Sequence, residues 1–146
     1  IGLGLKSGVI YAIDPFNAEG EPGSKEEYLL KKGNESLLYQ FLCNINRFGL
    51  SKSVIPLKGY SFEFSTYFNE IDFLFIDGDH SIDGCRNDFN LYSDKVKKGG
   101  FIAFHDYYPE RPELGPTWVI NNLLKQNKDF EITGIFDSLY IAKRIR

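Results

Sequence analysis

The chain has 146 residues, a length that suits one domain with a single substantial core. Hydrophobic residues make up 42% and charged residues 25%, and this ordinary globular composition excludes the disordered and collagen-like classes. No apolar run approaches the length of a membrane span, so we expect no membrane-embedded segment. The net charge of −3 leaves little positive charge to neutralise a phosphate backbone, so we do not expect nucleic acid as a partner.

The first part of the chain predicts a strand over residues 9–14, which ends at Asp14, and then an exposed loop over about residues 17–25. Pro15 ends the strand because the residue that precedes a proline is extended and a turn follows it. The chain starts at Ile1 and contains no methionine, so we expect that the natural amino terminus lies further upstream.

From residue 34 onward, helical and strand-like patterns alternate. Apolar residues three or four apart predict helices, and short runs of apolar residues predict strands. In chain order we expect a helix over 34–48, a strand over 53–57, a short helix or turn over 62–68, a strand over 71–76, a helix over 82–96, a turn at Gly99-Gly100 into a strand over 101–104, a helix over 117–128 preceded by Pro116, and a closing strand pair over 130–136 and 138–143 joined at Asp137. This alternation predicts an α/β fold, a doubly wound, mostly parallel sheet with helices on both faces. We expect residues 1–146 to form a single domain.

Two of these strands support more specific predictions. Pro56 cannot donate to a neighbouring strand, so the strand over 53–57 is expected at a sheet edge. The strand over 71–76 is so apolar that we expect both of its faces to be covered.

The strands over 71–76 and 101–104 both end abruptly in acidic and histidine side chains. The first runs into Asp77-Gly-Asp-His80 and the second into His105-Asp106, and these motifs hold the only two histidines of the chain. A simple Asp-Gly turn would explain the first motif if it stood alone. Because α/β proteins place ligands at the carboxyl ends of parallel strands, the two motifs together favour a functional site.

Two chemistries fit these side chains. Carboxylates with an imidazole could hold a divalent cation that lowers the pKa of a substrate hydroxyl. Alternatively, His80 or His105 could take the proton unaided, because imidazole titrates near neutrality. The residues alone leave both alternatives open.

Asp14 is a candidate for binding the two hydroxyls of a ribose, as acidic residues at this place do in nucleotide-binding α/β folds. The alternative is a turn-forming role before Pro15. Gly59 and Ser61 follow the next strand and could line the adenine side of a cofactor, although a plain strand-to-helix turn explains them equally well.

Cys43 and Cys85 are isolated from each other and form no CxxC motif. We therefore expect two packed, unpaired thiols, which suits a reducing compartment and a cytoplasmic location.

With Asp14, the Asp77-Gly-Asp-His80 loop and the run from Gly99 to Asp106 in view, the chain resembles class I S-adenosylmethionine-dependent methyltransferases. It is most similar to their small-molecule O-methyltransferase branch, which includes macrocin O-methyltransferase-like and cephalosporin-hydroxylase-like proteins. The likeness is most specific in IDFLFIDGDHS, followed by GGFIAFHD.

The resemblance implies a Rossmann-like sheet with a reversed last strand, S-adenosylmethionine as methyl donor, and Asp14 on its ribose. It also implies that Asp77 and Gly78 lie beside the donor. In metal-using relatives, acidic residues at the positions of Asp77, His105 and Asp106 bind Mg²⁺, so His105 is a departure from that pattern. The first strand of the fold, with its glycine-rich loop, is expected upstream of Ile1.

We therefore expect an S-adenosylmethionine-dependent enzyme that methylates a hydroxyl of a small molecule, with Asp77, His80 and His105 as catalytic candidates. The rival interpretations are a nicotinamide-dependent oxidoreductase of Rossmann type and a non-catalytic binding module with the same fold. A homo-oligomer is compatible with the sequence, which does not identify the acceptor.

Overall fold

The structure, a computed structural model, describes residues 8–18 and 25–146. It divides after Phe64 into two compact units, which are described separately. No helix in the described ranges is long and apolar enough to cross a membrane.

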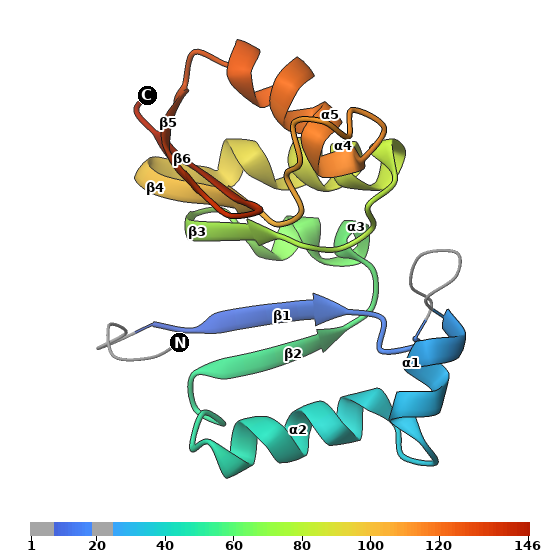
Figure 1. Ribbon diagram of the computed structural model, residues 1–146. Coiled ribbons are helices and arrows are strands. Elements are labelled where there is room, and N and C mark those ends of the chain that lie inside the picture. The colour runs from blue at the N-terminus through green and yellow to red at the C-terminus, as the bar shows by residue number, and fades with distance from the viewer. Residues whose placement is uncertain (1–7, 19–24) are drawn as a thin grey trace. The chain divides into compact units, whose positions relative to one another are not determined.

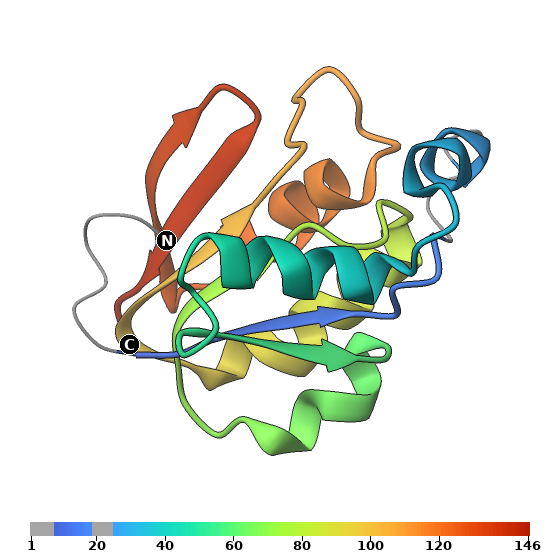
Figure 2. The same ribbon diagram turned by 90° about the horizontal axis from the view of Figure 1, so that it is seen from below.

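In the described residues of the first unit, two strands form a parallel sheet with helices. Strand β1, Ile10–Asp14, pairs with β2, Val54–Lys58, so that Asp14 lies opposite Lys58 at the carboxyl end of both strands. Helix α2, Leu37–Arg47, runs alongside these strands in both views (Figures 1 and 2). The described part of this unit also contains α1, Lys25–Lys32, and the short α3, Ser61–Phe64.

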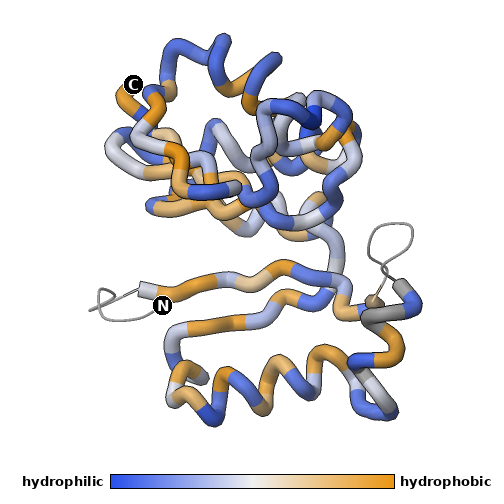
Figure 3. Tube along the Cα trace, viewed as in Figure 1, coloured by the Kyte–Doolittle hydropathy of each residue, from blue (hydrophilic) through white to orange (hydrophobic). Residues whose placement is uncertain are grey.

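Helix α2 shows why the local sequence folds as predicted. The Ser36 hydroxyl accepts a hydrogen bond from the Tyr39 backbone N–H at 3.1 Å and caps the helix. Gly49 follows the helix with a φ of 68°, a left-handed conformation that suits glycine. Hydrophobic and hydrophilic residues alternate around α2, whereas β1 and β2 are largely hydrophobic (Figure 3).

The second unit is a four-stranded sheet with helices. Its strands are β3 (Ile71–Ile76), β4 (Val96–Phe104), β5 (Phe130–Phe136) and β6 (Leu139–Arg144). Its helices are α4 (Ile82–Tyr92) and α5 (Gly115–Asn122), with short 3-10 helices at Ser65–Tyr67, Ser93–Lys95 and Leu124–Gln126. The strand order is β3-β4-β6-β5, in which β4 is parallel to β3 and antiparallel to β6. The predicted α/β architecture and its reversed last strand are thus confirmed.

Helices α4 and α5 cover the same face of this sheet (Figure 1). Ile76, Phe104 and Tyr140 are neighbours in register across β3, β4 and β6, so their side chains share one face. Burying each large apolar side chain stabilises the fold by about 1.5–3 kcal/mol. The cluster contains Ile76, Cys85, Phe89, Ile102, Phe104, Tyr107, Val119, Ile120, Leu124, Tyr140 and Ala142.

The predicted turn at Gly99-Gly100 is wrong, because both glycines lie inside β4. The pairing with β3 is irregular here: Ile71 faces Val96, but Phe73 faces Phe101. A Cβ atom on Gly100 would lie 2.8 Å from the backbone oxygen of Asp72, so glycine permits the close approach of β3 at this bulge.

Three further predictions are corrected. The expected cover on both faces of 71–76 is wrong, since Phe73 and Phe75 are 57% and 48% exposed. The helix expected over 82–96 ends at Tyr92, where a 3-10 turn leads into β4. The loop expected as far as Lys25 gives way there to α1, and residues 19–24 of that loop lie outside the described residues.

Candidate active site

The carboxyl ends of β3 and β4 bring the two predicted motifs together. Ile76 and Phe104, the last residues of these strands, are direct partners, and the His105 N–H donates to the Ile76 carbonyl at 3.1 Å. Asp77 and His105 therefore leave the sheet side by side. Burial of the preceding strand residues fixes these positions.

The four side chains form one cluster of two carboxylates and two imidazoles. His105 Nδ1 lies 3.3 Å from Asp77 Oδ1 and 3.1 Å from Asp106 Oδ2. His80 Nε2 lies 3.7 Å and 3.4 Å from the same two oxygens. The His80 side chain is 21% exposed and that of His105 is 43% exposed. The cluster is therefore partly shielded but open to solvent at His105.

The loop that carries His80 is held by backbone hydrogen bonds. Asp79 Oδ1 accepts from the Ser81 N–H at 2.8 Å, and Ser81 Oγ caps α4 by accepting from the Gly84 N–H at 3.0 Å. The Gly115 N–H donates to the His80 carbonyl at 2.8 Å. A Cβ atom on Gly115 would lie 2.3 Å from the Ser81 oxygen, so glycine is needed for this contact. Asp79 thus has a structural role in this loop.

Asp106 and His105 are held from the other side by the turn between β5 and β6. Asp106 has a φ of 56°, which is unusual for a residue other than glycine, and its Oδ1 accepts from the Tyr108 hydroxyl at 3.4 Å. The Tyr107 N–H donates to the Ser138 carbonyl at 2.9 Å, and Ser138 Oγ lies 3.5 Å from His105 Nε2. Both ring nitrogens of His105 therefore face polar groups.

Sequence reasoning missed Ser138 and Gly115 as parts of this site. Ser138 was expected only as the first residue of a closing strand, and it contacts His105 across 33 positions. Gly115 precedes Pro116, so the sequence signalled a helix start but not the contact with His80. Both contacts are long-range, and no local pattern encodes them.

A subset of the cluster has the arrangement of a cation site. One ligand atom each from Asp77, His80 and Asp106 lies within 4.8 Å of the other two. The sequence predicts His105 in place of His80, and that ligand set stays a prediction.

The predicted cofactor residues of the first unit also gather at strand ends. The Gly59 N–H donates to the Asp14 carbonyl at 3.1 Å, and Ser61 opens α3 two residues later. Asp14 Oδ1 accepts from the Phe16 N–H at 2.5 Å, which is the hydrogen bond of an Asx turn. The turn-forming role of Asp14 is therefore present in the structure, and its role toward a ribose stays a prediction.

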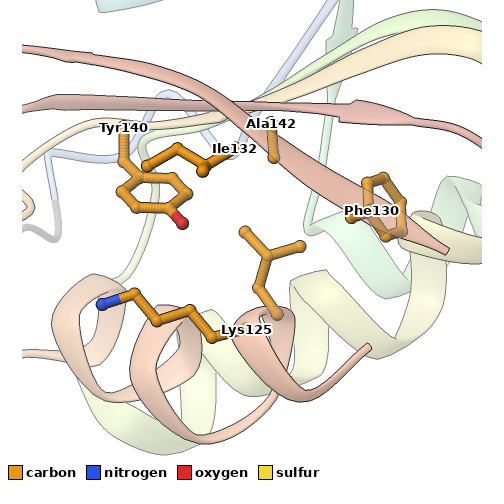
Figure 4. A pocket seen from close by; sticks show the side chains of 6 residues that line it. Lys125, Phe130, Ile132, Tyr140 and Ala142 are labelled. Atoms are coloured by element: carbon orange, nitrogen blue, oxygen red, sulfur yellow. The ribbon is translucent and has the colours of Figure 1, made fainter. Parts of the chain in front are cut away.

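A pocket of about 200 Å³ lies elsewhere in the second unit, between β5–β6 and the segment at Leu124 and Lys125 (Figure 4). Its lining residues are Leu124, Lys125, Phe130, Ile132, Tyr140 and Ala142. Because this lining includes none of the described Asp and His side chains of the cluster, we do not assign the pocket to the chemistry.

The two cysteines differ from the expected pair of packed thiols. Cys85 is buried as predicted, but Cys43 is exposed on α2, so the expectation is wrong for Cys43. Burial raises the pKa of the Cys85 thiol to about 12, with smaller contributions from the carboxylates of Asp88 and Asp79. Cys85 is thus an unreactive core residue at neutral pH.

This fold is the fold of α/β methyltransferases. The O-methyltransferase NovP is 18% identical with a TM-score of 0.69, over 97% of this chain and 62% of that chain. The O-methyltransferase TomG from Streptomyces achromogenes, solved in complex with SAM, is 14% identical with a TM-score of 0.62, over 94% of this chain and 73% of that chain.

A family model described as a methyltransferase domain matches residues 2–107, and the chain belongs to this family. Uncharacterized protein R132 of Acanthamoeba polyphaga mimivirus is 34% identical over 109 residues, which are 73% of this chain and 45% of R132. The chain thus spans less than half of this viral relative and about six tenths of NovP.

Proposed function

We propose that the protein transfers the methyl group of S-adenosylmethionine to a hydroxyl group of a small molecule. The observation that carries this proposal is the cluster at the ends of β3 and β4, where two imidazoles lie within 3.7 Å of Asp77 and Asp106 oxygens. Membership of a methyltransferase family supports the reaction type. Similarity to NovP and TomG, both named O-methyltransferases, supports a hydroxyl as the acceptor.

His105 is the proposed general base. Its Nδ1 faces the carboxylates of Asp77 and Asp106, which orient the ring, while Nε2 lies near Ser138. The acceptor proton moves to Nε2 as the hydroxyl oxygen attacks the methyl carbon. The bond from that carbon to sulfur breaks, and sulfur keeps the electron pair, which leaves neutral S-adenosylhomocysteine. Base catalysis of this kind contributes about 10²–10⁴-fold.

The donor is proposed to bind through Asp14, whose carboxylate can accept hydrogen bonds from both ribose hydroxyls. We assign Gly59 and Ser61 to the adenine side, and Asp77 and Gly78 to the neighbourhood of the donor. Holding the methyl group in line with the acceptor oxygen supplies much of the rate gain. The family match extends across the boundary between the two units, which supports our proposal that residues 1–146 form one methyltransferase domain.

The cation that metal-using relatives bind, Mg²⁺, does not fit the cluster well. Mg²⁺ prefers an octahedron of oxygen atoms, whereas the cluster offers imidazole nitrogen beside its two carboxylates. No step of the proposed reaction therefore uses Mg²⁺.

No described feature favours an oxidoreductase or a non-catalytic module over this proposal. The net charge of −3 supports a small-molecule acceptor over a nucleic acid. The exposed thiol of Cys43 supports a reducing, cytoplasmic location. Assembly into a homo-oligomer stays a prediction.

The test is calorimetry with S-adenosylhomocysteine, followed by transfer of labelled methyl from S-adenosylmethionine to a panel of small hydroxyl compounds. We expect saturable binding at micromolar concentrations and label in at least one acceptor. Binding of reduced nicotinamide dinucleotide without binding of S-adenosylhomocysteine would instead support the oxidoreductase. Binding with no transfer to any hydroxyl, but with transfer to amines or thiols, would reject the O-methyl assignment.

A further inference from the structure

We propose that the pocket between the β5–β6 hairpin and the segment at Leu124 and Lys125 binds a small carboxylate with one aromatic ring. Lys125 and Tyr140 hold the two carboxylate oxygens, and the apolar lining holds the ring. The site is separate from the candidate active site, because its described lining contains none of the Asp and His side chains of that cluster. The proposal therefore goes beyond the proposed function, and it can be tested without a methyl donor.

The pocket offers an apolar surface on the scale of one ring. Its volume is about 200 Å³, and an engineered cavity of about 150 Å³ in another protein is large enough to bind benzene. Leu124 and Tyr140 are each 2% exposed and Ala142 is 1% exposed, whereas Ile132 is 53% exposed. A ring in this pocket would cover the exposed part of Ile132, and burial of apolar surface favours binding.

Lys125 supplies a positive charge at this pocket. Its ammonium donates to the Asn121 side-chain oxygen at 2.7 Å and to the Tyr107 hydroxyl at 3.2 Å, and it lies 5.5 Å from the centre of the Tyr107 ring. Both partners are neutral, and no carboxylate of a described residue pairs with Lys125. Because an ammonium group has three N–H donors, one donor and the whole charge are available to a ligand.

Tyr140 supplies a second donor. Its ring packs edge-on against Tyr107, with 5.1 Å between the ring centres, and its hydroxyl makes no hydrogen bond to another described residue. Every fully buried side-chain N or O atom of the described residues has a partner, so this oxygen must reach open space. Figure 4 shows it directed toward the segment that carries Lys125. Burial raises the pKa of the Tyr140 phenol, and Tyr107 raises it further, so the hydroxyl keeps its proton at neutral pH.

One positive charge and two available donors match one carboxylate group. Tyr107 contacts both Lys125 and Tyr140, which keeps the two donors at the same end of the pocket (Figure 4). Each donor can bond one carboxylate oxygen, and hydrogen bonds to a charged group are the stronger kind. A phosphate group would bring a second negative charge without a partner, which is costly to desolvate. A neutral ring would leave both donors unpaired.

The test is an NMR titration of the whole chain with sodium benzoate. We expect saturable shifts of the amide signals of Phe130, Ile132 and Ala142, with a dissociation constant of roughly 0.1–10 mM for a ligand of this size. Benzamide has the same ring without the charge, and inorganic phosphate has charge without a ring. Both should bind at least about tenfold more weakly than benzoate.

Two substitutions remove one donor each. Lys125→Met keeps the aliphatic chain and loses the charge, and Tyr140→Phe keeps the ring and loses the hydroxyl. Each should weaken benzoate binding by at least about tenfold, the cost of one hydrogen bond to a charged group.

Lys128→Met is the matched control, because Lys128 is exposed, lies three residues after Lys125 and does not line the pocket. It removes the same charge and should leave benzoate binding unchanged. Circular dichroism on each variant shows whether it has folded.

Four outcomes would overturn the proposal: no saturable shift with benzoate, equal binding of benzamide, unchanged benzoate affinity in folded Lys125→Met, or shifts confined to the residues around His80 and His105. If Tyr140→Phe does not fold, Lys125→Met still tests the site, because Lys125 is exposed and lies outside the core. Failure here would leave binding of S-adenosylhomocysteine untouched, so the two proposals fail separately.

Discussion

Candidate site residues lie in two regions, at the end of β1 and at the ends of β3 and β4. Local structure explains the positions of the residues in the first region but not those in the second. At the end of β1, the Asp14 carboxylate accepts a hydrogen bond from the Phe16 N–H two residues later. Gly59 donates to the Asp14 carbonyl and lies in an ordinary strand-to-helix turn. At the ends of β3 and β4, Asp77 and His105 meet although they lie 28 positions apart in the sequence. No turn or helix cap requires that meeting.

This difference shows how strongly geometry can support a function. A side chain that already completes a turn gives little information about a ligand, because the turn alone accounts for it. Polar side chains that converge from separate strands need another explanation, because no local turn or cap accounts for their meeting. The geometry of the second unit therefore supports the proposed chemistry. The role of Asp14 in the first unit must be tested by variants that distinguish its turn-forming hydrogen bond from its proposed contact with a ligand.

The largest expected effect is on turnover in His105→Ala. Loss of the general base should lower methyl transfer by about 10²–10⁴-fold. S-adenosylhomocysteine affinity, measured by calorimetry, should not change, since His105 acts on the acceptor. Unchanged turnover in a folded His105→Ala variant would refute the assignment.

The next effect is on donor binding, and two substitutions of Asp14 separate its turn from its charge. Asp14→Asn keeps a side-chain acceptor for the Phe16 N–H but loses the charge, and a hydrogen bond to a charged group contributes about 1.5–3 kcal/mol. We expect both Asp14→Asn and Asp14→Ala to weaken S-adenosylhomocysteine binding by roughly 10- to 100-fold in calorimetry. Full affinity in Asp14→Asn would leave Asp14 with the turn alone.

A smaller effect is expected from Gly115→Ala, which places a methyl group 2.3 Å from the Ser81 oxygen. Overpacking of this kind costs about 1–3 kcal/mol of unfolding free energy, measured by urea denaturation. It should also shift the NMR signals of His80, which are simple to follow in a chain with two histidines.

Gly33→Ala is the control, because Gly33 has a φ of 62° and no atom within 4 Å of an added Cβ. It should cost about 1–2 kcal/mol of backbone strain and leave the His80 signals in place. Equal shifts of the His80 signals in Gly115→Ala and Gly33→Ala would show that Gly115 does not hold His80 in place.

The smallest effect concerns the two thiols, which lie one in each unit and differ in their exposure. Cys43 is exposed, whereas Cys85 is 1% exposed with its pKa raised to about 12 by burial. A thiol reagent at pH 8 should modify one cysteine in the folded protein and two after denaturation. In Cys43→Ser, the folded protein should not react, and rapid modification of that variant would contradict the burial of Cys85.

The sequence predicted the parts of the site that follow from pattern. Apolar runs that end in Asp and His located the ends of β3 and β4, and Asp137 located the turn of the closing strand pair. Helix α1 was missed because its mostly polar sequence, KEEYLLKK, gives a weak apolar stripe. The sequence predicts a turn at the glycines inside β4, because the close approach of Asp72 depends on the neighbouring strand and leaves no local pattern.

Contacts between distant residues could not be predicted in the same way. Gly115 and Ser138 have ordinary local roles, at a helix start and after a turn, and their contacts with His80 and His105 arise only in the folded sheet.

The contact between Ser138 and His105 has a consequence for synthesis on the ribosome. The chain emerges from its amino terminus, so Asp77, His80 and His105 leave the ribosome before the turn that supports them. Until β6 is made, one edge of β4 has no partner strand, and the Tyr107 N–H lacks the carbonyl of Ser138. The cluster of Asp and His side chains therefore gains its contact with Ser138 only after the β5–β6 hairpin has docked.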